Sequence, residues 1–217
     1  MSYTSYTQRI TLALALLLLA PGAARAGKRM NNSRSYKESY RLEAKRDYSG
    51  ALRALEGIRG QRSSYFLQLR VGWLRYLAGK QRGSIRAYRA AVALRPRAVE
   101  PYLGLMLPQM ASRRWKDALK TGRQAVRRAP GNVVASTRMA WILFNLGRHA
   151  ESVRVYRHLL EQYPSNLELR RGLGWALLKQ GKAGQARQVF DGVLQYSPSD
   201  TSALAGLRKT ARRRSSL

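Results

Sequence analysis

The chain has 217 residues, of which 41 are lysine or arginine and 11 are aspartate or glutamate, so its formal net charge is +30. It contains no cysteine, which excludes disulfides and leaves packing alone to hold the fold. The missing cysteine also excludes a bacterial lipoprotein, because lipid attachment needs one at the processing site. So strong a positive field attracts polyanions. Arginine richness can equally reflect coding bias, and solvated charge needs no ligand.

The first 26 residues have the layout of a secretory signal peptide. A polar segment precedes the apolar run Ile10–Ala20, a Pro-Gly pair breaks that run, and an Ala-Arg-Ala sequence ending at Ala26 supplies the cleavage pattern. The apolar run is too short to span a bilayer, which needs about 20 residues. We therefore expect cleavage after Ala26, an exported and periplasmic mature chain without a transmembrane span, and a short linker at 27–30.

Export changes which anionic partners the charge favours. In a cytosolic protein of this charge, nucleic acid would be the first anionic partner to expect. After export, lipopolysaccharide, anionic lipid head groups, acidic polysaccharides and acidic protein surfaces come before nucleic acid. A cytosolic nucleic-acid binder, whose N-terminus is no signal, stays as the weakest alternative.

Proline recurs at residues 96, 130, 164 and 198, at a constant interval of 34 residues. Each proline follows a segment with helical apolar periodicity and opens a short polar turn. A constant period of this length is typical of a helix-turn-helix unit copied in tandem. The prolines therefore define four units, at 65–98, 99–132, 133–166 and 167–200.

Small and large residues recur in phase inside these units. Small residues let paired helices approach closely, large residues fill the space between them, and glycine ends the first helix of a pair. The first recurring position is mostly small: Gly72, Met106, Ala140 and Gly174. A turn glycine follows at Gly79, Gly147 and Gly181. A second small position then holds Ser84, Ala118, Ser152 and Ala186, and a mostly aromatic position holds Tyr88, Gly122, Tyr156 and Phe190.

This pattern resembles the tetratricopeptide repeat family. The resemblance implies an all-α protein, a right-handed α-solenoid of about five repeats. It includes a degenerate copy at 31–64, and 201–217 forms a capping helix followed by a basic tail. Unit 99–132 diverges, because it lacks the turn glycine and the aromatic residue, and because Pro108 should kink or shorten its first helix.

The resemblance places the first helices along a concave groove. The residue after the first small position then faces the groove, with a second row three residues later, so we expect apolar anchors at Trp73, Leu107, Trp141, Trp175, Tyr76, Met110 and Phe144. Arg70, Arg138 and Arg171 should rim this groove and orient a bound peptide. The alternative is that the rings pack between repeats and are mostly buried. The residues do not match the carboxylate-clamp version of the family, which uses lysine and asparagine here.

Basic residues repeat in register on the predicted second helices. Spacings of three and four residues keep them on one stripe of each helix, and stacking sets the stripes about 10 Å apart. We call this stripe the basic ridge; it comprises Arg82, Arg86, Arg89, Lys116, Lys120, Arg123, Arg154 and Arg157. Such a ridge can contact a polyanion, or it can be a solvated face without a ligand.

No catalytic or metal-binding pattern is present in the sequence. Its histidines, His149 and His158, have no cysteine or paired acids beside them, and a metal site needs three or four converging ligands. We therefore expect no enzyme activity and no cofactor. The favoured function is a protein-interaction adaptor in a bacterial cell-envelope assembly, which binds a protein or peptide in the aromatic groove. The alternative is a module that binds lipopolysaccharide, an acidic polysaccharide or an anionic membrane surface through the basic ridge.

Overall fold

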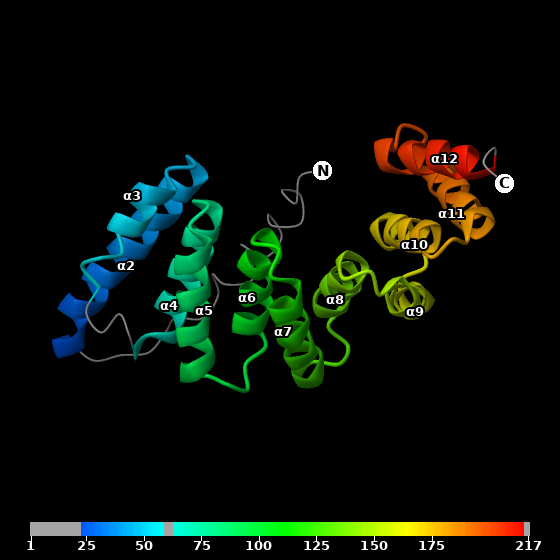
Figure 1. Cartoon of the computed structure of the whole chain (residues 1–217). Coiled ribbons are helices and arrows are strands. Elements are labelled where there is room, and N and C mark those ends of the chain that lie inside the picture. Colours follow the sequence, from blue (N-terminus) through cyan, green and yellow to red (C-terminus); the bar gives the residue numbers. More distant parts are fainter. Residues whose placement is uncertain (1–22, 59–62, 215–217) are drawn as a thin grey trace.

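The computed structural model describes residues 23–58 and 63–214, and within this part the chain is entirely helical. The first helices of the units are α2 (Ala23–Ala44), α4 (Tyr65–Leu77), α6 (Glu100–Ala111), α8 (Val133–Asn145) and α10 (Leu167–Lys179), and α12 (Thr201–Arg214) follows the last unit. The second helices are α3 (Tyr48–Arg53), α5 (Gln81–Leu94), α7 (Trp115–Arg128), α9 (His149–Gln162) and α11 (Ala183–Tyr196). Figure 1 shows them stacked in chain order, which confirms the predicted α-solenoid. The predicted signal peptide lies mostly outside the described residues.

Polar residues after the prolines start the next helices. The Asn132 side chain accepts a hydrogen bond from the Ala135 amide at 2.9 Å, and Asn166 accepts one from Leu169 at 3.1 Å. Asp200 does the same for Ala203 at 2.9 Å. These are N-caps, which satisfy one of the amide groups left unpaired at a helix start. Three of the proline turns thus end in a side-chain cap that marks where the next helix begins, whereas α6 has Val99 in this position and no side-chain cap.

The turn inside each unit needs a left-handed backbone. Gly79, Gly147 and Gly181 have φ values of 71°, 75° and 89°, a region that glycine enters without steric cost. The divergent unit keeps the same turn without glycine, because Arg113 takes it with φ 55°. Arg46 does so before α3, with φ 61°. The missing turn glycine has therefore not changed the connection, although it strains the backbone there.

Pro108 lies inside α6, three residues before the helix ends at Ala111. α6 spans 12 residues, whereas α4, α8 and α10 span 13 each. The proline is fully buried and the helix continues past it, with the Ser112 amide bonded to its carbonyl at 3.0 Å. The expected disruption is thus limited to about one residue of helix length, which is within the uncertainty of helix ends.

Hydrogen bonds join the two helices of a unit at the second small position. The Ser84 hydroxyl donates to the Gly72 carbonyl at 2.7 Å, and Ser152 donates to the Ala140 carbonyl at 2.8 Å. Both serines are fully buried. The small residues therefore permit close approach and also satisfy the polar groups that this approach buries.

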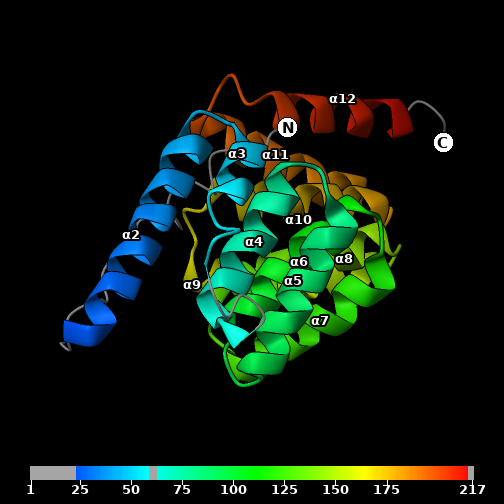
Figure 2. The ribbon, with the colours of Figure 1, turned by 90° about the vertical axis from the view of Figure 1, so that its left-hand side faces the viewer.

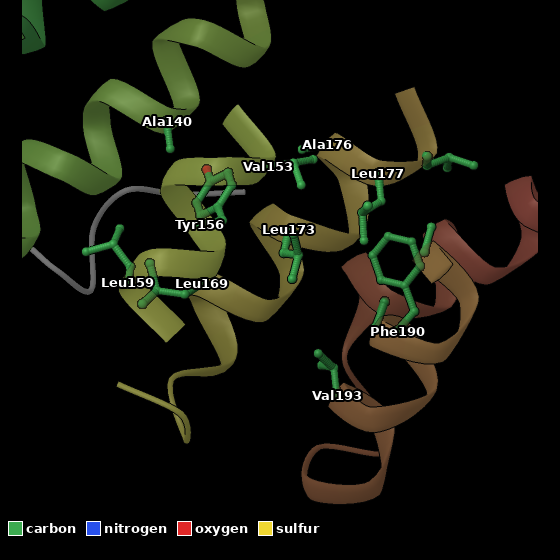
Figure 3. Close-up of a cluster of buried hydrophobic side chains, with 13 residues drawn as sticks. Ala140, Val153, Tyr156, Leu159, Leu169, Leu173, Ala176, Leu177, Phe190 and Val193 are labelled. Carbon is green, nitrogen blue, oxygen red and sulfur yellow. The ribbon is translucent and has the colours of Figure 1, made fainter. Parts of the chain in front are cut away.

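Successive units are joined by a large aromatic ring that packs on a glycine. A Cβ atom placed on Gly104 would come within 2.1 Å of the Tyr88 ring. One on Gly172 would come within 2.4 Å of Tyr156. Gly206 faces Phe190 in the same way, also at 2.4 Å. Tyr156 and Phe190 belong to the same buried cluster, where Figure 3 shows Tyr156 beneath Ala140 and Phe190 beside Leu177.

The junction after the divergent unit is built differently. The aromatic position holds Gly122, and the position that is glycine at the three aromatic junctions holds Arg138. Met106, which is fully buried, places its Cε 3.0 Å from where a Gly122 Cβ would be. Arg138 is also buried, at 9% exposure. At this junction the large side chains, Met106 and Arg138, therefore lie on the first helices α6 and α8, where the aromatic junctions have small residues.

The two ends of the stack differ from the repeats between them. α2 has 22 residues, includes the predicted linker 27–30 and extends past the helices stacked against it (Figure 2). α3 has only six residues, whereas the other second helices have 14. α12 covers the predicted cap and continues through Arg214, so part of the expected basic tail is helical.

Candidate protein-binding surfaces

The three tryptophans of the predicted groove are each half-buried between successive first helices. Trp73 donates from Nε1 to Glu43 Oε1 on α2 at 2.6 Å, and Trp175 donates to the Ser202 hydroxyl on α12 at 2.9 Å. Trp141 stacks on Phe144, with ring centroids 5.2 Å apart and planes 9° from parallel. Trp73 and Trp175 thus bond to neighbouring helices of the array, and Trp141 packs against the buried cluster of α6, α7 and α8. All three rings still present part of their surface to solvent.

The remaining residues of the predicted groove differ in exposure. Tyr76 and Phe144 are half-buried, whereas Leu107 and Met110 are only 6% and 8% exposed. The divergent unit therefore contributes core residues here and interrupts the aromatic row. Burial raises the pKa of the Tyr76 phenol, while nearby Arg138 acts in the opposite direction, so this ring stays neutral under ordinary conditions.

Arg70 is buried between α2 and α4 and so does not lie on an exposed rim. Its guanidinium pairs with the Glu43 carboxylate and donates from Nη2 to the Ser39 hydroxyl at 3.0 Å. It also lies 3.8 Å from the centroid of the Tyr40 ring. Glu43 accepts from Trp73 as well. A buried charge with this many partners is satisfied locally, so Arg70 fixes α2 onto α4.

Arg138 and Arg171 also connect successive first helices. Arg138 donates from Nη1 to the Leu103 carbonyl of α6 at 2.6 Å. Arg171 pairs with the buried Asp200 carboxylate just before α12, while its own side chain is 30% exposed. Of the three predicted rim arginines, Arg171 alone keeps substantial exposure. The sequence placed these residues near the groove but did not reveal their bonds across the repeat junctions.

Four residues that complete this region were missed from the sequence. Tyr40 and Glu43 come from α2, and Asp200 and Ser202 from the start of the cap. The turn residues Arg46 and Gly79 match when the first unit is counted with a period of 33 residues. With this period, Tyr40 occupies the position of Trp73, and Glu43 occupies the position of Tyr76. An alignment of the repeats that allows a one-residue deletion in the first unit identifies Tyr40 and Glu43.

All eight residues of the basic ridge are exposed on α5, α7 and α9. Acids beside them are already paired: Arg114 binds Asp117 at 2.6 Å and Arg148 binds Glu151 at 2.5 Å. The Arg148 hydrogen bond lowers the pKa of Glu151, and the ridge residues Arg154 and Arg123 lower it further. The ridge therefore imposes a positive potential on its surroundings. The basic ridge does not continue onto α11.

The described residues contain no group of three or more metal-binding side chains, and none of their helices is long and apolar enough to cross a bilayer. His149 begins α9 against the Phe144 ring, at 5.4 Å between centroids. Burial lowers its pKa, and Lys179 lowers it further. His158 is exposed and contacts Glu161 at 3.1 Å. The two histidines therefore lie in separate environments.

Comparison with known proteins supports the repeat assignment. Residues 137–201 match the tetratricopeptide repeat model, which overlaps the two units with the most regular pattern. No curated protein matches the sequence.

Solved structures resemble the chain over most of its length. A tetratricopeptide repeat protein from Parabacteroides merdae ATCC 43184 aligns with a TM-score of 0.74 and 15% identity, covering 83% of this chain and 72% of that one. MamA residues 41 to end from Desulfovibrio magneticus RS-1 gives 0.72 and 15%, covering 79% and 97%. YrrB, described as a tetratricopeptide repeat protein with an unusual peptide-binding site, gives 0.62 and 17%, covering 74% and 82%. This chain thus has the α-solenoid fold of tetratricopeptide repeat proteins and carries a recognisable repeat at 137–201.

Proposed function

We propose that this protein is a non-enzymatic interaction scaffold that binds a segment of a partner protein along its row of tryptophans. The observation that carries the proposal is the state of Trp73, Trp141 and Trp175, which are held by neighbouring repeats but retain exposed surface. A rigid, partly exposed aromatic ring offers contact area with little loss of entropy on binding. Tryptophan is also enriched among residues that dominate binding energy.

The chemistry of the row indicates what a partner segment would offer. Apolar side chains would pack against Trp141 and its stacked neighbour Phe144. Negative charge would be favoured near Lys209, which is exposed and lies 5.3 Å from the centroid of the Trp175 ring, and near the exposed part of Arg171. An extended or helical peptide with apolar anchors and some acidic residues meets both requirements.

We place this scaffold in a bacterial cell envelope, in keeping with the signal-like N-terminus of the sequence. The alternative of a polyanion-binding module is not favoured. Its support is the exposure of the basic ridge, and exposed charge needs no ligand to be stable in water.

A two-step pulldown tests the proposed function. The mature chain is immobilised and incubated with envelope extract, and bound material is eluted first with high salt and then with mild detergent. High salt releases partners that are held by exposed charges, because such contacts are already screened within about 8 Å at physiological ionic strength. A partner held by the aromatic row should therefore remain bound through the salt step. Release of all partners by salt would contradict the proposal.

Substitutions locate the contact. Trp141→Ala with Trp175→Ala should abolish capture, whereas Tyr196→Ala removes an aromatic ring that is 71% exposed outside the row and should not. Circular dichroism establishes that helicity is kept, and Trp175→Phe separates packing from recognition, because it preserves most of the apolar volume. Unchanged capture by the folded double variant would refute the groove.

A further inference from the structure

The second-helix side of the solenoid is interrupted at its N-terminal end. α3 has six residues and α5 has 14, so α3 is shorter by about 12 Å at 1.5 Å per residue. A cavity of about 880 Å³ lies beside it, between α3, α4 and the turn that starts α5. We call this cavity the notch. Its volume is within the range of about 300–1,000 Å³ that is usual for binding sites.

The floor of the notch is apolar. Leu55 and Leu67 are almost fully buried beneath it, while Leu52 and Val71 are half-buried and remain partly accessible. Aliphatic side chains in contact with water favour a ligand that also carries apolar groups. The floor therefore does not suit a purely polar polyanion.

The rim of the notch is strongly basic. Five cations and a single carboxylate line it: Arg53, Arg75, Lys80, Arg82, Arg86 and Glu56. None of the five forms an ion pair with an acid in the described part of the chain. Arg82 and Arg86 are also the first residues of the basic ridge, so the ridge begins at the notch.

Comparison with the other repeats shows why charge gathers here. The position of Arg75 is occupied by Gln109, Leu143 and Leu177 in later units, and all three are buried. The position of Gly83 is occupied by Asp117 and Glu151, each of which pairs with the arginine before its helix. In α5 the glycine provides no carboxylate, and the Arg75 stem packs against it instead. The notch thus has an added cation and lacks the acid of its neighbours.

We propose that the notch binds an acidic amphipathic helix of a partner protein. Carboxylates on one face would pair with the rim, and leucine-like side chains on the other would cover Leu52 and Val71. A helix is favoured because the notch is bounded by helices at the place where helical turns of α3 are missing. A second copy of this chain is disfavoured, because its net charge of +30 would repel. This surface lies apart from the tryptophan row, so the inference goes beyond the function proposed above.

The test uses the whole mature chain and two labelled synthetic peptides. One peptide, about 14 residues long to match a second helix, carries leucine at helical spacing and glutamate elsewhere. The other has the same composition in scrambled order, which keeps the charge and removes the apolar face. Fluorescence anisotropy measures binding of each, and dextran sulfate serves as a polyanion without apolar groups.

Matched variants assign the contact. Arg53→Glu, Arg82→Glu and Arg86→Glu reverse three exposed charges at the notch, and Arg123→Glu, Arg154→Glu and Arg157→Glu make the same change on α7 and α9. We expect the notch variant to bind the ordered peptide at least about tenfold more weakly and the control variant to stay close to the parent. The scrambled peptide should bind about tenfold more weakly to the parent chain. Trp141→Ala with Trp175→Ala should leave peptide binding unchanged, which separates this inference from the groove.

Three results would overturn the proposal: no measurable binding of the ordered peptide, equal binding of both peptides, or equal losses in the two charge-reversal variants. Equal losses together with tight binding of dextran sulfate would assign the surface to simple polyanions.

Discussion

Two repeat junctions in this solenoid solve the same packing problem with opposite choices of residue. Between α9 and α10, the Tyr156 ring lies where any side chain on Gly172 would be. Between α7 and α8, the aromatic position is Gly122, and Arg138 stands at the place of Gly172. The stack nevertheless continues through both junctions (Figure 1). The difference shows that a junction requires complementary sizes across the interface, whichever helix provides the large side chain.

At the arginine junctions, the residue in the place of glycine also makes a polar cross-link, which glycine cannot provide. Arg138 donates a hydrogen bond to α6, and Arg70, opposite the aliphatic Leu55, binds Glu43 and Ser39 on α2. A polar cross-link fixes the relative position of two first helices through directed bonds. Arg70 and Arg138, which the sequence predicts at the rim of the groove, therefore fix successive first helices to one another.

Gly172→Ala should have the largest effect, because it breaks the aromatic–glycine junction. The new Cβ would lie 2.4 Å from the Tyr156 ring, which is only 4% exposed and has no free space to move into. We expect a loss of about 3 kcal/mol in the free energy of unfolding, measured with urea. Gly184→Ala is the matched control, because it also changes a helical glycine but has nothing within 4 Å. It should stabilise by about 0.5–1 kcal/mol. Equal effects would show that the ring does not define the junction.

Gly122→Phe should convert the exceptional junction towards the regular one. Alone, the new ring would meet Met106, and we expect a loss of about 2 kcal/mol from overpacking. Adding Met106→Ala and Arg138→Gly should recover at least half of that loss, because these residues then match the other units. Urea unfolding of the single, double and triple variants measures this coupling. Purely additive losses would contradict size complementarity.

Acidification should weaken the last junction, where Arg171 holds Asp200 at the start of α12. Burial alone would raise the pKa of Asp200, but the hydrogen bonds from the Ala203 amide and Arg171 outweigh it and lower the pKa overall. The carboxylate therefore adds stability above its unfolded pKa of about 3.9, and this stability is lost as pH falls through the lower folded value. Hydrogen exchange of α12 between neutral pH and about pH 3 measures it. In Asp200→Asn, which retains the cap, this part of the pH dependence should vanish.

Arg113→Gly should have the smallest effect, a stabilisation of about 1 kcal/mol, because it relieves the left-handed backbone in the divergent unit. Gly147→Ala makes the reverse change at the equivalent turn, where nothing lies within 4 Å, and should destabilise by a similar amount. Thermal unfolding compares the two. A destabilised Arg113→Gly would mean that the arginine side chain contributes more than the backbone strain costs.

The sequence predicted the parts of the fold that repeat and missed those that occur once. Proline spacing and the small positions located the helix pairs because each unit imposes the same packing. The partners of Arg70 and Arg171 could not be read in that way, since Glu43 and Asp200 lie at the ends of the array. One is shifted by a residue in register, and the other caps a helix that follows the last unit. The notch likewise depends on where α3 ends, which periodicity alone does not reveal.

For the candidate groove, the sequence left two alternatives open, an exposed aromatic row and rings packed between repeats. Half-buried tryptophans agree with both sequence alternatives, because each ring contacts its neighbours and keeps exposed surface. Leu107 and Met110 in α6 are buried, and Leu178 of α10, at the position equivalent to Met110, is also buried at 4% exposure. Burial along these rows therefore varies between units in a way that the repeat pattern alone does not reveal.

Site-specific photocrosslinking tests the central claim that the tryptophan row binds a partner protein. A photoreactive phenylalanine derivative replaces Phe144, which stacks on Trp141, or Gln185, which is exposed on α11. The protein is then irradiated in envelope extract. We predict one discrete protein adduct from position 144, and we expect this adduct to be lost in the variant with Trp141→Ala and Trp175→Ala. No adduct of the same mass should form from position 185. An adduct from position 185 alone, or none from position 144, would contradict it.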